Sequence, residues 1–202
     1  AQIGGGSPLP RVTRRQADAL RAELVRRGHG QAVVEVVMRY TPPRAAEVLA
    51  QLAARGETRA LALPLYPHEC RATTGSGIAE LESLQPRLAP SLRIEPIVSW
   101  HLDPGYVDLL AARVRAAVAS LPAGAQPRAV LLFSAHGVPE ALPRRGDPYV
   151  DQVKETVERV RERLGTGHAH RLGWQSRTGP VKWVGPGTDE VIAELAGAEA
   201  VV

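Results

Sequence analysis

The sequence has 202 residues, of which 44% are hydrophobic and 23% charged, a balance typical of a globular protein with a sizeable core. The formal charge is +4, but acids and bases are interspersed and only 4% of residues are aromatic, which argues against nucleic-acid binding and leaves a small anionic ligand open. There is no signal peptide or run of eighteen apolar residues, and Cys70 is the single cysteine, so we expect no membrane span, no internal disulfide and a cytoplasmic location.

Helical and strand patterns alternate along the whole chain. Residues 13–27 have apolar side chains at helical spacing, with Thr13 and Gln16 in capping-box positions. The β-branched run AVVEVVM at 32–38 is typical of a strand, and the Asp-Pro pair at 147–148 is a strong helix start. In chain order we predict helices over 13–27, 42–55, 76–85, 104–120, 148–164 and 188–197, and strands over 32–38, 59–65, 92–98, 129–135 and 170–176, with a last strand beginning at 198.

Strands of continuous apolar character that alternate with helices indicate parallel pairing with helices on both faces, so we predict a doubly wound α/β fold. The length fits two α/β halves, residues 1–103 and 104–202. The chain begins without Met and stops two valines into a strand. We therefore expect a fragment that lacks the first strand of one half and the end of the last strand of the other.

The stretch LLFSAHGVPE, residues 131–140, runs an apolar strand into His136. In open α/β sheets, ligands bind beyond the carboxyl ends of the strands, which is where this imidazole is expected. A lone histidine at a strand end is, however, most often a structural hydrogen-bonding residue. Position alone leaves both roles open.

Three other stretches place polar or aromatic side chains near strand ends. MRYTPP, residues 38–43, contains Arg39 and Tyr40, and an arginine there can serve structure or bind a carboxylate through paired hydrogen bonds. IGGGSPL, residues 3–9, is glycine-rich but lacks the spacing of a P-loop. GWQSRTGPVKWVGP, residues 173–186, contains two tryptophans that can pack in a core or form an apolar wall for a flat ligand.

Taken in order, the stretches IGGGSPL, MRY, LPLYPHECRATTGS, LLFSAHGVPE, RGDPY and GWQSRTGPVKWVGPGTDE resemble the ferrochelatase family over essentially the whole chain. The resemblance implies two Rossmann-like halves with a porphyrin cleft between them, and a lyase that inserts ferrous iron into a porphyrin late in heme biosynthesis. Iron is then a substrate, and no permanently bound cofactor is expected. The substrate is protoporphyrin or coproporphyrin, and contact with a membrane surface stays open.

By the resemblance, His136 is the catalytic and metal-contacting residue. A neutral imidazole can accept a pyrrole proton or hold the incoming iron, since its pKa lies near working pH and Fe²⁺ accepts imidazole nitrogen. A site shaped for a bent macrocycle favours the transition state over the flat porphyrin. The resemblance further implies porphyrin contacts from Ser7, Arg39, Tyr40 and Trp183.

The sequence departs from the family pattern at two places. The acidic partner of His136, a Glu expected just after the final strand, is not present in this chain. Cys70 precedes by one place the position of an iron–sulfur cysteine in some members, and Arg71 occupies that position, so no cluster is expected. Two alternatives to ferrochelatase are a related chelatase, such as one for cobalt and sirohydrochlorin, and a tetrapyrrole-binding module without catalysis.

Overall fold

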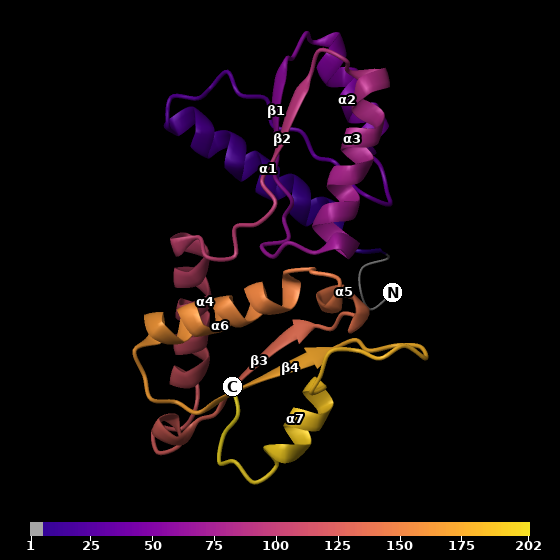
Figure 1. Ribbon diagram of the computed structural model, residues 1–202. Helices are drawn as coiled ribbons and strands as arrows, with labels where there is room; N and C mark the ends of the chain where they lie inside the picture. Colours follow the sequence, from indigo (N-terminus) through magenta and orange to yellow (C-terminus); the bar gives the residue numbers. More distant parts are fainter. Residues whose placement is uncertain (1–5) are drawn as a thin grey trace. The chain divides into compact units, whose positions relative to one another are not determined.

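The computed structural model describes residues 6–202, so the first part of the glycine-rich stretch, residues 3–5, lies outside the described residues. The described chain forms two compact units, labelled by element in Figure 1. The first extends to Ala62 and resumes at Gly77–Pro96, and the second contains Leu63–Ser76 and Ile97–Val202. The predicted halves, 1–103 and 104–202, stay a prediction. The two compact units have other bounds, because residues 63–76 and 97–103 belong to the second unit.

The first unit is built around a short parallel sheet. Its elements are α1 (Leu9–Arg26), α2 (Ala45–Ala54), β1 (Arg59–Ala62), α3 (Ser76–Leu88) and β2 (Arg93–Pro96). β1 and β2 pair in parallel, with Ala60 opposite Ile94, as predicted for these two strands. Leu49 of α2 is buried with Leu92, and Leu81, Leu84 and Leu88 of α3 pack against the same cluster. α2 and α3 therefore cover this sheet through one apolar core.

Residues 32–38 form no strand, so that prediction was wrong. Their backbone groups have local partners instead of a ladder: Arg21 donates to the Val34 carbonyl at 2.8 Å, and Met38 N donates to the Pro43 carbonyl at 2.8 Å. A β-branched run becomes a strand only where a neighbouring strand pairs with it. The described residues supply none at this place.

Three helix starts also differ from the prediction, and one of them is that of α2, which begins at Ala45 and not at residue 42. α1 begins at Leu9, so Thr13 lies inside the helix and the predicted capping box was wrong; Pro8 occupies the N-cap and Pro10 lies in the first turn, where its missing N–H costs nothing. Pro148, not Asp147, is the N-cap of the helix that follows it, although Asp147 Oδ1 still accepts from Tyr149 N at 3.0 Å.

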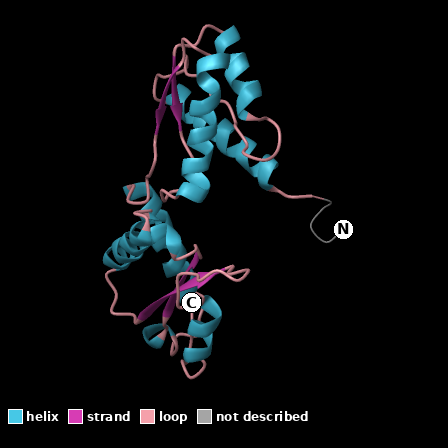
Figure 2. Ribbon diagram, turned by 45° about the vertical axis from the view of Figure 1, so that its right-hand side comes forward, coloured by secondary structure: helices cyan, strands magenta, loops and turns pink. Residues whose placement is uncertain are grey.

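The second unit contains the other sheet and the remaining helices (Figure 2). Its elements are η1 (Arg71–Gly75), α4 (Pro104–Ala119), η2 (Gln126–Arg128), β3 (Leu131–His136), α5 (Ala141–Arg144), α6 (Tyr149–Leu164), β4 (His170–Gln175) and α7 (Thr188–Glu194). β3 and β4 are parallel, with His136 opposite Gln175. The predicted strand after residue 198 is present as a single parallel bridge from Val201 to Val130.

Helices cover both faces of the β3–β4 sheet, with α6 and α7 on opposite sides in Figure 1. Phe133 packs into the cluster of α4 and α6, whereas the Ser134 hydroxyl lies 2.9 Å from the Thr188 hydroxyl at the start of α7. A side chain at Gly173 would place its Cβ 2.7 Å from Thr188 Cα, so only glycine permits this close approach. The predicted α/β class, with helices on both faces of a parallel sheet, is confirmed.

We expect Leu49→Ala to lower the free energy of unfolding of the first unit by about 2–5 kcal/mol, because it leaves a cavity where a side chain is 1% exposed. The control is Leu109→Ala in α4, where the side chain is 55% exposed and the change should stay within about 0.5 kcal/mol. The measurement is urea unfolding followed by far-UV circular dichroism, since Trp100, Trp174 and Trp183 all lie in the second unit. Equal losses in both variants would contradict this core.

Candidate functional site

His136 is the last residue of β3 and its side chain is exposed. Because side chains alternate along a strand, His136 and Ser134 lie on the face that α7 partly covers, opposite the face where Phe133 meets α4 and α6. Within the described part of the chain, the imidazole makes no hydrogen bond of its own. The ring is therefore presented at the carboxyl edge of the sheet, close to where the sequence predicted it.

Trp183 lies beside the residue that follows His136. Its backbone is bridged to Pro139, its indole Nε1 donates to the Thr178 carbonyl at 2.8 Å, and its ring carbon Cε3 would lie 3.5 Å from a Cβ on Gly137. Such a Cβ would also meet the Gln175 carbonyl oxygen at 2.9 Å. Glycine at 137 thus lets the loop carrying Trp183 close against the end of β3, at the residue that follows His136.

The same loop lines a cavity of about 590 Å³ that is open to solvent. Arg177 fixes the loop to α7 by ion pairs with Asp189 at 3.1 Å and Glu190 at 3.0 Å. The cavity is lined by Trp174, Gln175, Ser176, Arg177, Thr178, Gly179, Val181, Trp183, Thr188 and Asp189. A large aromatic wall with amide, hydroxyl and guanidinium groups suits a flat ligand that carries polar substituents.

Ser7, Arg39 and Tyr40 belong to the first unit. Ser7 is exposed ahead of α1, and its hydroxyl accepts from Leu9 N at 3.3 Å. The Arg39 guanidinium lies 5.2 Å from the centre of the Tyr40 ring, within the range of a cation–π interaction. Tyr40 is 78% exposed, so its ring is available to a ligand.

Two arginines share one carboxylate beside Tyr40. Arg39 lies 3.2 Å and Arg44 2.8 Å from the two oxygens of Glu80, whose side chain is 16% exposed. The group therefore keeps a positive charge that Glu80 does not balance. The Nε atoms of both arginines are buried without a hydrogen-bond partner in the described structure, which leaves two donors unsatisfied.

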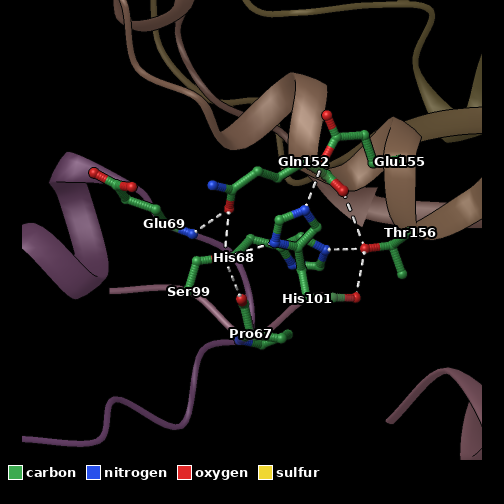
Figure 3. Close-up of polar contacts among 8 residues, drawn as sticks. All are labelled: Pro67, His68, Glu69, Ser99, His101, Gln152, Glu155 and Thr156. Atoms are coloured by element: carbon green, nitrogen blue, oxygen red, sulfur yellow. Dashed lines mark hydrogen bonds and ion pairs between the residues drawn. The ribbon is translucent and has the colours of Figure 1, made fainter. Parts of the chain in front are cut away.

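A second polar cluster, drawn in Figure 3, was not predicted from the sequence. His68 Nε2 lies 2.9 Å from the Thr156 hydroxyl of α6. His101 bridges Ser99 and α6, with Nδ1 2.6 Å from the Ser99 hydroxyl and Nε2 2.8 Å from the Glu155 carboxylate. The centres of the two imidazole rings are 5.8 Å apart.

The cluster joins segments that follow β1 and β2 to a single helix face. Gln152 Oε1 accepts from Glu69 N at 2.7 Å and from the Ser99 hydroxyl at 3.1 Å, and Thr156 lies one turn further along the same face. The sequence signal was available in two places: polar residues 152 and 156 at helical spacing, and a histidine a few residues after each of two parallel strands.

The described residues contain no group of three or more His, Cys, Asp or Glu side chains that could hold a metal ion. Cys70 is buried in the core cluster of the second unit, and burial raises the pKa of its thiol. No helix in residues 6–202 is long and apolar enough to cross a bilayer.

A parallel sheet with helices on both faces defines this chain as an α/β protein, and its exposed His136 lies at the carboxyl edge, where ligands bind in open α/β sheets. A comparison with protein families makes the class specific. The family model for ferrochelatase matches residues 1–202. The chain belongs to the ferrochelatase family, as its sequence motifs indicated.

Individual relatives agree with the family match. The chain is 37% identical to a ferrochelatase of Desulfotalea psychrophila, over 96% of this chain and 59% of the relative. It is 41% identical to a ferrochelatase of a Synechococcus strain, over 96% of this chain and 57% of the relative. It is 40% identical to ferrochelatase-2, chloroplastic, of Cucumis sativus, over 96% of this chain and 38% of the relative. The chain thus spans less than two thirds of the length of these relatives.

The second cluster generates a pH prediction. Burial, helped by the nearby His101 ring, lowers the pKa of His68 from 6.5 to about 4. The unfolded chain takes up this proton at higher pH than the folded chain, so the stabilisation is complete above pH 6.5 and is lost as the pH falls toward 4. Because His68 is only part-buried, we expect its contribution to be about 1–2 kcal/mol.

The measurement is urea unfolding of the second unit by tryptophan fluorescence at pH 7.5 and 5. His68→Gln should show a smaller loss of stability between the two pH values than the parent chain. His29→Gln, at an exposed loop position of the first unit, should retain the parental loss. An unchanged loss in His68→Gln would show that this imidazole does not titrate with folding.

Proposed function

We propose that the protein containing this chain is a lyase that inserts ferrous iron into a porphyrin, with His136 as the proton acceptor and metal contact. The observation that carries the proposal is the exposed imidazole at the end of β3, next to the glycine against which the Trp183 ring lies, in a chain of the ferrochelatase family. Ser7, Arg39, Tyr40 and Trp183 are the proposed porphyrin contacts.

The reaction requires two pyrrole N–H bonds to break and four iron–nitrogen bonds to form, with two protons released. An exposed imidazole that makes no hydrogen bond with the described residues has a ring nitrogen available to accept such a proton. Exposure also lets the ring pass the proton to water, so that it is ready for the next one. The flat indole of Trp183 supplies an apolar surface against which a macrocycle can stack.

The Arg39–Arg44–Glu80 group supports binding of the porphyrin's carboxylate side chains. Its uncompensated positive charge attracts an anion, and each buried Nε–H would gain a partner from a carboxylate oxygen or a bridging water. Arginine suits this task because its planar fork matches a carboxylate. The single cysteine is compatible with the cytoplasm as the site of the reaction.

We expect His136→Ala in the full-length protein to lower the rate of ferrous or zinc insertion by about a hundredfold to ten-thousandfold, the usual cost of losing a general base. Porphyrin binding should persist, because the exposed imidazole contributes little to the apolar wall. His29→Ala, at an exposed loop position, is the control and should retain parental activity.

Three results separate the proposal from its alternatives. Retention of more than about a tenth of the parental rate in His136→Ala, well outside the general-base range, would make His136 structural. Insertion of cobalt into sirohydrochlorin but of no metal into porphyrins would indicate a related chelatase. Porphyrin binding without any insertion by the parent would indicate a binding module.

Trp183→Ala should weaken porphyrin binding by about fivefold to a hundredfold, since stacking on an aromatic ring and the area it buries are worth on the order of 1–3 kcal/mol. The measurement is a Soret-band titration with protoporphyrin and with coproporphyrin. Leu109→Ala, exposed on α4, is the control. Parental affinity in Trp183→Ala for both porphyrins would remove this residue from the site.

A further inference from the structure

The peptide group between His136 and Gly137 is hydrogen bonded on both sides. Gly137 N donates to the Gln175 carbonyl at 2.7 Å, which continues the β3–β4 ladder by one bond. On the other side, the Tyr149 hydroxyl donates to the His136 carbonyl at 3.0 Å. A side chain of α6 thus takes the place of a ladder partner where β3 ends.

Tyr149 is itself firmly held. Its backbone N–H donates to Asp147 Oδ1 at 3.0 Å, and the other oxygen of this carboxylate accepts from Arg71 N at 2.8 Å. Asp147 is 3% exposed, so both bonds are sheltered from water. The Tyr149 ring packs against Trp174, 6.1 Å between ring centres, and edge-on against His68 at 5.8 Å. These contacts fix the Tyr149 ring at the start of α6, and so they fix the position of its hydroxyl.

The hydroxyl also keeps its proton throughout the working pH range. Burial raises the pKa of Tyr149 to about 12, with smaller effects from Cys70 and Tyr106. Near neutral pH the group is a donor, which is the role that the His136 carbonyl requires.

We propose that Tyr149 is a positioning residue for His136. Its hydroxyl restrains the His136–Gly137 peptide and so fixes the backbone from which the exposed imidazole projects, while the ring of His136 stays free of internal hydrogen bonds. A group that takes part in chemistry must be held within about 0.5 Å of its productive place by such supporting contacts. The inference rests on the proposed role of His136 in metal insertion and assigns Tyr149 no contact with substrate.

The test is Tyr149→Phe in the full-length protein, which removes the hydroxyl and keeps the ring that packs on Trp174 and His68. The net worth of one hydrogen bond predicts a kcat for zinc insertion about twofold to tenfold lower, counted per porphyrin-binding site. The KM for porphyrin and the Soret titration should be unchanged, and the melting temperature should change little. A purely structural role would instead reduce the number of binding sites at constant kcat per site.

The matched control is Tyr106→Phe in α4. Tyr106 is also half-buried with a pKa raised by burial, and its hydroxyl makes no hydrogen bond within residues 6–202. This variant should keep the parental kcat. An equal fall in both variants would assign the effect to the loss of any buried hydroxyl and overturn the proposal.

A second readout does not depend on activity. With ¹³C-labelled histidine, the His136 ring signal is identified by its disappearance in His136→Ala. Tyr149→Phe should shift or broaden that signal and leave the His29 and His168 signals in place. An unchanged His136 signal, or a parental kcat in Tyr149→Phe, would overturn the positioning role. Absence of insertion by the parent would instead contradict the proposed function, and the ring signal would still decide the role of Tyr149.

Discussion

The parallel pairing of β3 with β4 determines where each candidate group of the second unit lies. In a parallel ladder the carboxyl ends of both strands meet at one edge, so His136 and Gln175 are opposite one another. The chain that continues from Gln175 must then pass the end of β3, and it does so as the loop that carries Trp183. An exposed histidine and an aromatic wall from separate segments of the chain thus lie at one edge because of one ladder.

α6 contacts the rest of the second unit through an apolar face and a polar face, and both stabilise the elements around the end of β3. Its apolar side chains, including Val153 and Val160, fill the cores that lie against the sheet. Its polar face holds the segments after β1 and β2 through Gln152 and Thr156, while Tyr149 at its start reaches the end of β3. The buried polar groups of this face are almost all paired with the crossing segments, so the helix specifies their positions as well as burying apolar surface.

Much of this arrangement could be predicted from sequence because the strongest signals are local. Strand and helix periods located β1 to β4 and most helices, and the family motifs led to the prediction of His136 and Trp183 as site residues. The failures depend on contacts that no local pattern contains. Residues 32–38 have strand propensity but no partner among the described residues, and the His68–His101 cluster exists only because two separate crossings meet α6.

His68 and His136 lie in opposite environments. His68 is partly buried against a hydroxyl and a second imidazole, so the cost of charging it falls on the fold. His136 has the reverse arrangement: the peptide that follows it is hydrogen bonded on both sides, while its exposed ring makes no hydrogen bond with any residue in 6–202. The end of the β3–β4 ladder and the Tyr149 hydroxyl thus hold the backbone of His136 in place without engaging its ring.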